Sequence, residues 1–173
     1  MKTGVIDVEN GALRIGEILI PATATFDETL LLAPDKDAVR DVQTGYKWIY
    51  IRGVPIEERS FHFALCFYQG RLYRAEIGFG KKGSGKVDRS GKEKPWSWDD
   101  WSEEEELRTK RRYNRWLDKT IGKKRKFPWG RVAARYDLKS ASSSIEIFYV
   151  NKYLDALFGK NVSQDYLSSG KSA

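Results

Sequence analysis

The chain of 173 residues is long enough for one domain with its own hydrophobic core. Its hydrophobic fraction of 40% and aromatic fraction of 13% argue against disorder, and no run of about 18 apolar residues predicts a membrane span. The formal net charge of +7 favours an anionic partner, while a single cysteine and a single histidine exclude an internal disulfide and make a zinc site improbable.

Two short elements are predicted near the N-terminus. Residues 12–20 alternate in polarity around Gly16, which predicts one strand with a bend or bulge. Thr25 and Glu28 have the spacing of a capping box and Pro34 follows, so residues 26–32 are predicted to form a helix.

Three strands are then predicted in quick succession, at residues 46–52, 60–68 and 71–79. The short connections between them indicate an antiparallel meander. The middle strand has period-two alternation, which places four large apolar residues on one face: Phe61, Phe63, Leu65 and Phe67.

The second half of the chain begins with a basic segment rich in Gly, Ser and Lys, residues 81–94, predicted to be a mobile loop. A long helix to about Ile121 and two strands, at 131–137 and 144–150, follow. Together these elements predict an α+β fold, in which a three-strand meander and a further hairpin form an antiparallel sheet with the long helix packed on a face. Residues 1–150 are predicted to be a single domain, and residues 151–173 a C-terminal extension that is partly helical and then frayed.

The sequence does not favour an enzyme. His62 and Cys66 share a strand face, but four residues along a strand span about 13 Å, whereas a nucleophile and its base need contact at about 3 Å. The serines before Ile145 have no histidine nearby in the sequence, and no phosphate-loop spacing is present. We therefore expect no catalytic residue, metal or cofactor.

One candidate partner-binding surface lies where the long helix begins. Ser102 and Glu105 form a capping box, and acidic residues in a first helical turn are favoured by the helix dipole, which accounts for much of this cluster. Asp99 and Asp100 are less well explained by the start of the helix, and a partner contact is favoured for them over a metal or catalytic role. Trp96 and Trp98 are equally compatible with burial under the helix and with a protein-binding hot spot. The candidate residues are Trp96, Trp98, Asp99, Asp100, Glu103 and Glu104.

A second candidate surface is the basic side of the same helix. It comprises Arg108, Arg112, Arg115, Lys119, Lys123 and Lys124. Such a row could contact the phosphates of a nucleic acid. The favoured interpretation is a solvated helix face, with Glu104 and Arg108 paired one turn apart.

A set of short motifs resembles those of small, mostly uncharacterised bacterial proteins of about this size. The motifs are Ile15-Gly16, W.Y at Trp48, F.F.L.F from Phe61, SWDDWSEEEEL from Ser97, PWG at Pro128, YD at Tyr136 and SSSIEIFY from Ser142. The resemblance covers residues 11–150, and some proteins of this kind are thought to be immunity proteins encoded beside secreted antibacterial toxins. No catalytic residues come with it.

This resemblance implies a cytoplasmic, non-enzymatic protein that binds and neutralises a cognate toxin by occluding its active site or substrate path. The N-terminal residues lack the apolar run of a secretory signal, which agrees with a cytoplasmic location. The alternative is a nucleic-acid-binding module that uses the basic side of the helix, and no membrane partner is expected.

Overall fold

The computed structural model describes residues 5–32, 39–81 and 101–150 of the chain. The predicted basic loop after Lys81 and the predicted C-terminal extension lie outside these residues. The helices are α1 (Phe26–Leu32) and α2 (Glu103–Thr120). The strands are β1 (Leu13–Ile15), β2 (Ile18–Ile20), β3 (Val39–Asp41), β4 (Tyr46–Ile56), β5 (Arg59–Tyr68), β6 (Arg71–Lys81), β7 (Lys126–Phe127), β8 (Gly130–Asp137) and β9 (Ser142–Tyr149).

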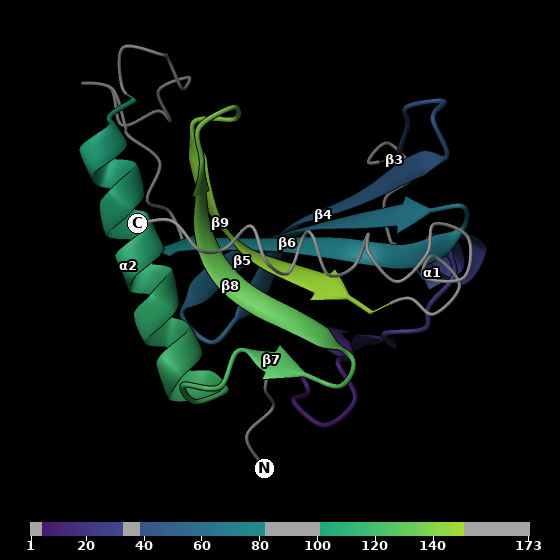
Figure 1. The fold of residues 1–173 in the computed structure, drawn as a ribbon, viewed down its shortest axis with the longest axis horizontal. Coiled ribbons are helices and arrows are strands. Elements are labelled where there is room, and N and C mark those ends of the chain that lie inside the picture. The colour runs from purple at the N-terminus through teal and green to yellow at the C-terminus, as the bar shows by residue number, and fades with distance from the viewer. Residues whose placement is uncertain (1–4, 33–38, 82–100, 151–173) are drawn as a thin grey trace.

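Seven of the strands form one antiparallel sheet in the order β3-β4-β5-β6-β9-β8-β7 (Figure 1). The predicted meander is β4–β5–β6 and the predicted hairpin is β8–β9, and they join where Ile77 of β6 faces Ile145 of β9. The α+β class is confirmed, but the sheet is larger than predicted because the short edge strands β3 and β7 were missed. Such edge strands have too few residues to show a period-two pattern.

The N-terminal segment differs from its prediction. Residues around Gly16 form a two-strand hairpin, in which Ile15 faces Ile18, instead of one bent strand. Gly16 has a φ of +61°, a conformation that glycine adopts without strain, so the chain reverses at this point. The predicted helix at 26–32 is confirmed as α1, and the Thr25 and Glu28 side chains each accept a hydrogen bond from the other's backbone N–H.

One face of the sheet forms the core. Its central row, one residue from each of five neighbouring strands, consists of Ile49, Leu65, Ala75, Ile147 and Val132, and all five are buried. At one end of this face Phe26 of α1 packs edge-on against Phe67, with 5.6 Å between ring centroids. At the other end Trp116 of α2 lies 5.8 Å from Phe61, which shares a face of β5 with Phe67. Both helices therefore cover the same face.

Helix α2 begins and ends as its sequence predicts. The Ser102 hydroxyl accepts a hydrogen bond of 3.2 Å from the Glu105 N–H, and Gly122 follows the last turn with a φ of +79°. The buried side of the helix carries Tyr113, whose hydroxyl accepts a 3.1 Å hydrogen bond from the backbone N–H of Phe79. This contact fixes α2 against the end of β6, so the opposite side of the helix faces away from the sheet (Figure 1).

Candidate functional site

The first predicted surface is only partly described. Trp96, Trp98, Asp99 and Asp100 lie outside the described residues, so their predicted role stays a prediction. Glu103 and Glu104 are exposed in the first turn of α2, where the helix dipole favours them.

Trp101 connects the start of α2 to the sheet. Its indole Nε1 donates a 2.7 Å hydrogen bond to the carbonyl of Ala141, in the turn between β8 and β9. Trp101 is half-buried, so it helps to anchor the helix.

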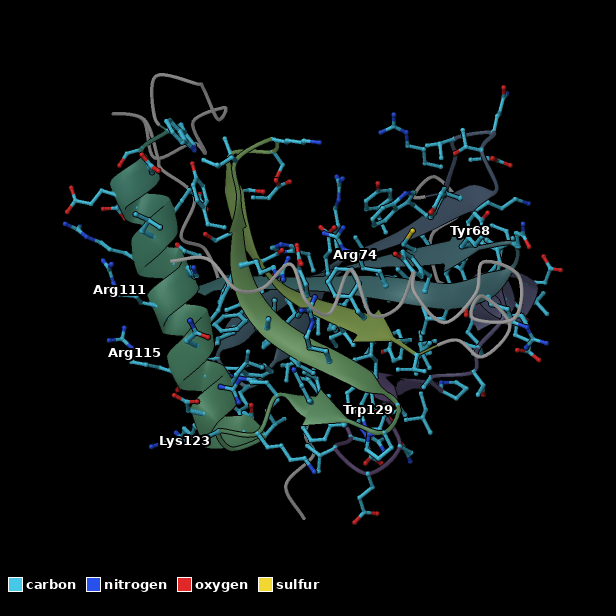
Figure 2. All side chains as sticks on the ribbon, in the orientation of Figure 1. Tyr68, Arg74, Arg111, Arg115, Lys123 and Trp129 are labelled. Atoms are coloured by element: carbon cyan, nitrogen blue, oxygen red, sulfur yellow. The ribbon has the colours of Figure 1, made fainter. Side chains whose placement is uncertain are left out.

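The second predicted surface is present, but not all of its residues are available to a partner. Arg108 forms ion pairs of 2.6 Å with Glu104 and 2.7 Å with Glu105, which confirms the pairing one turn apart. The other predicted cations are exposed: Arg112, Arg115, Lys119, Lys123 and Lys124. In Figure 2, Arg111, Arg115 and Lys123 point away from the sheet. The exposed side of α2 is therefore a basic surface.

A different site lies on the face of the sheet opposite the core, which we call the concave face. The sheet twists so strongly that β8 and β9 cross the direction of β4, β5 and β6 (Figure 1). The twist encloses an open cavity of about 620 Å³ between the β8–β9 hairpin and the β3–β4 end of the sheet. Its lining includes aromatic residues (Tyr46, Trp48, Tyr73, Tyr136 and Phe148) and charged residues (Arg74, Arg135, Asp137, Lys139 and Glu146).

A buried carboxylate organises the charged residues of the concave face. Glu146, with only 4% of its surface exposed, accepts a 2.8 Å hydrogen bond from Nη2 of Arg74 and lies 3.6 Å from Nε of Arg135. Arg74 also contacts Glu76 at 2.7 Å. Burial raises the pKa of the Glu76 carboxyl, an effect that Arg74 opposes and Glu146 reinforces. In Figure 2, Arg74 lies in the middle of the sheet, well apart from the basic residues of α2.

Three guanidinium groups surround the ring of Phe148. Arg131, Arg74 and Arg135 lie 5.1, 5.2 and 6.0 Å from its centroid, within the range of cation–π contacts. Arg131 is only 7% exposed, yet its Nε and Nη2 have no hydrogen-bond partner, and the same is true of Nε of Arg74. Burial lowers the pKa of the Arg131 guanidinium, and the nearby charge of Arg135 lowers it further.

Cys66 also lines the cavity but is poorly suited to nucleophilic chemistry. It is buried, and burial raises the pKa of its thiol to about 12, so the thiol stays protonated near neutral pH. Among the residues that the structure describes, no group of three or more His, Cys, Asp or Glu side chains could hold a metal ion. In the same residues no helix is both long and apolar enough to cross a membrane.

Sequence reasoning missed the concave face, although its residues were visible. Arginine and glutamate alternate with apolar residues in β6, β8 and β9, as at Arg74, Arg131 and Glu146. That alternation places them on the face opposite the core. It does not say which strands are neighbours, so it could not show that these side chains meet.

The fold and site define an α+β protein with a curved antiparallel sheet whose concave face carries arginine and aromatic side chains. No family model matches the chain. No curated protein matches it either. Among solved structures, a chain of "Rhs1-CT in complex with cognate immunity protein RhsI1" aligns with a TM-score of 0.48 and 14% identity, covering 90% of this chain and 96% of that chain. A likeness at this level carries no argument about function.

Proposed function

We propose that this chain is an immunity protein that binds a cognate secreted bacterial toxin and neutralises it by occluding the toxin's active site or substrate path. The observation that carries the proposal is the concave face, which combines Trp48, Phe148 and three arginines on one sheet. Tryptophan, tyrosine and arginine are the residues that most often dominate the binding energy of protein interfaces. The motif resemblance and the protonated Cys66 thiol support binding over catalysis.

The sheet is a suitable platform for occlusion. Its side chains project from strands whose other face is a packed core, so few conformations are lost when a partner docks. A hydrophobic anchor also stands at the edge of the concave face. Leu138, in the β8–β9 turn, is 77% exposed, and its neighbours Asp137 and Lys139 line the cavity. We propose that a partner docked on the concave face covers the Leu138 side chain.

The tryptophan-rich segment remains part of the proposal. Trp101, which follows that segment, is hydrogen-bonded to Ala141 in the same β8–β9 turn as Leu138. We keep Trp96, Trp98, Asp99 and Asp100 as proposed partner-binding residues, together with Glu103 and Glu104. The expected place of action is the cytoplasm.

The first prediction concerns the edge of the concave face. Co-expression of the full chain with the toxin encoded beside its gene should restore growth, and the two proteins should co-purify as a stable complex. Leu138→Ser should weaken that complex by about tenfold, which corresponds to about 1.4 kcal/mol of binding free energy, as measured by calorimetry.

The matched control is Leu31→Ser on α1. Leu31 is 87% exposed, and α1 lies at the opposite end of the sheet from the β8–β9 turn (Figure 1). This variant should keep full affinity. If the chain neither rescues growth nor co-purifies with the toxin, the proposed function is wrong.

Nucleic-acid binding is the second candidate, because α2 presents a basic surface directed away from the sheet (Figure 2). If this candidate were correct, affinity for a mixed-sequence duplex would fall steeply with salt, because phosphate contacts release counterions. Replacing Arg115 and Lys119 by glutamine would weaken binding and flatten the salt dependence. We expect the opposite result in electrophoretic mobility assays, namely no specific affinity and no effect of these substitutions.

A further inference from the structure

The arginine cluster of the concave face, defined as Arg74, Arg131 and Arg135, has more hydrogen-bond donors than acceptors. Arg74 uses Nη2 on Glu76 and Glu146, while its Nε has no partner. Arg131 is more than nine-tenths buried and leaves both Nε and Nη2 without a partner. Buried donors are nearly always satisfied, and a buried donor without an acceptor costs about 1–3 kcal/mol. Unused donors at this place therefore suggest that an acceptor arrives from outside.

The charges near the cluster also favour an incoming anion. Arg74, Arg135 and Lys139 line the cavity, and Arg131 lies next to them against Phe148. The carboxylates of the lining are Glu146 and Asp137, and Glu76 is paired with Arg74. Asp137 is occupied by its own turn, where it accepts hydrogen bonds from the Lys139 N–H at 3.0 Å and the Ser140 hydroxyl at 2.9 Å. These donors are neutral and Asp137 keeps its negative charge, so among the described residues four cations face three carboxylates and leave an excess of one positive charge.

The same arrangement distinguishes between kinds of anion. Glu76 and Glu146 would repel a run of consecutive phosphates more strongly than a single carboxylate, because each further phosphate adds negative charge. Arginine binds carboxylates through two parallel hydrogen bonds, which requires neighbouring donors such as Nε and one Nη. Nε and Nη2 of Arg131 are such neighbours and both lack a partner, but both atoms are covered in the free protein, so the side chain has to turn towards the cavity to pair with a carboxylate.

The walls of the cavity suit a peptide segment that carries this carboxylate. Its lining combines Arg74 and Arg135 of the cluster with aromatic side chains, including Trp48 and Phe148, and its volume of about 620 Å³ holds more than one side chain. Aromatic walls exclude water from an ion pair, and the pair is then stronger than at an exposed surface.

We propose that the arginine cluster of the concave face is a subsite for a single acidic side chain, an aspartate or glutamate, supplied by the partner protein together with an adjacent apolar residue that packs on the aromatic wall. This inference rests on the proposed function and names the chemistry of the partner. An acidic side chain also agrees with the anionic partner that the net charge of +7 favours.

The test uses the full chain and nuclear magnetic resonance. The probe is the blocked peptide acetyl-Glu-Phe-Asp-Glu-amide, and its matched control is acetyl-Gln-Phe-Asn-Gln-amide. The acidic peptide should shift the Nε–Hε signals of the three cluster arginines and the amide signals of β6, β8 and β9, and the neutral peptide should not. A third titration uses inorganic phosphate, which should cause smaller shifts at the same concentration.

Two substitutions test the cluster itself. Arg135→Gln should weaken binding of the acidic peptide by at least fivefold, and it should leave the fold intact because Arg135 is part-exposed and its ion pair is long, at 3.6 Å. Arg131→Gln should have the larger effect, by about thirtyfold or more, because its donors are buried. The matched control is Arg115→Gln on α2, which should bind the peptide as the unsubstituted chain does.

Three results would overturn the inference. The first is equal shifts with the acidic and neutral peptides, and the second is equal or stronger binding of phosphate. The third combines two observations: the acidic peptide leaves the spectrum unchanged, and the Arg135→Gln substitution, without any peptide, shifts signals from residues 151–173. That result would mean that this chain's own C-terminal segment fills the site.

Failure of this inference can be separated from failure of the proposed function. If the toxin is bound and neutralised with unchanged affinity by Arg135→Gln, the inference is wrong while the proposed function stands. If the acidic peptide binds the cluster but no toxin is neutralised, the inference stands and the proposed function is wrong.

Discussion

Replacing Glu146 by alanine is expected to lower the free energy of unfolding by about 3–5 kcal/mol. Glu146 is 4% exposed and is the carboxylate that Arg74 and Arg135 share. Without it, the arginine cluster would hold three positive charges around one ring, and only Arg74 would keep an ion pair that the structure shows, with Glu76. Removing one member of a buried ion pair is costly because the other charge stays desolvated and uncompensated. Urea unfolding followed by circular dichroism measures the change.

The matched control is Glu104→Ala, which removes an arginine–glutamate pair of similar length from the surface of α2. Arg108 and Glu104 are 2.6 Å apart, but their side chains are 56% and 73% exposed. Surface pairs of this kind contribute about 0–1 kcal/mol, so this variant should unfold almost as the unsubstituted chain does. Equal losses in the two variants would show that burial of Glu146 has no special role in stability.

At the arginine cluster, we expect the stability of the free protein and the binding of a partner to make opposite demands. The unpaired donors of Arg131 and Arg74 lower the stability of the free protein, because no described residue accepts from them. The same donors are what a partner's carboxylate would use. Groups that are costly in the free protein and satisfied only in a complex are a common property of functional sites.

Much of the fold could be predicted from local patterns. The alternation at Phe61, Phe63 and Phe67 identified the core face of β5, and the Ser102 capping box identified the start of α2. These features depend on residues that are close in the sequence. The hairpin at Gly16 was missed because a glycine within an alternating stretch fits a bulge as well as a turn.

The pairing of β6 with β9, which joins the meander to the β8–β9 hairpin, could not be predicted in the same way. Ile77 and Ile145 pair although they are far apart in the chain. The sequence of neither strand indicates which strand it pairs with. The candidate site depends on that pairing, since Arg74 of β6 meets Glu146 of β9 only because those strands are neighbours. Single-sequence analysis therefore found the exposed charges of α2, which one helix determines, and missed the arginine cluster, which three strands determine.

Replacing Phe67 by alanine is the other substitution for which we expect a large effect, a loss of about 3–5 kcal/mol in the free energy of unfolding. The Phe67 side chain is 0% exposed, and its ring meets that of Phe26 edge-on, so its removal leaves a cavity where α1 packs on the sheet. Edge-on aromatic pairs add about 0.5–1.5 kcal/mol to the energy of burial. Thermal and urea unfolding should both show the loss.

The comparison with Phe148→Ala separates the two faces of the sheet. Phe148 is half-buried and its ring contacts the arginine cluster instead of the core, so its removal should cost about 1–2 kcal/mol of stability. Phe148→Ala should nevertheless weaken binding of the acidic peptide more than Phe67→Ala does, because the Phe148 ring holds the three guanidinium groups together. Binding is compared under conditions in which both variants are folded. If Phe67→Ala instead weakened binding more than Phe148→Ala did, the concave face would not be the binding surface.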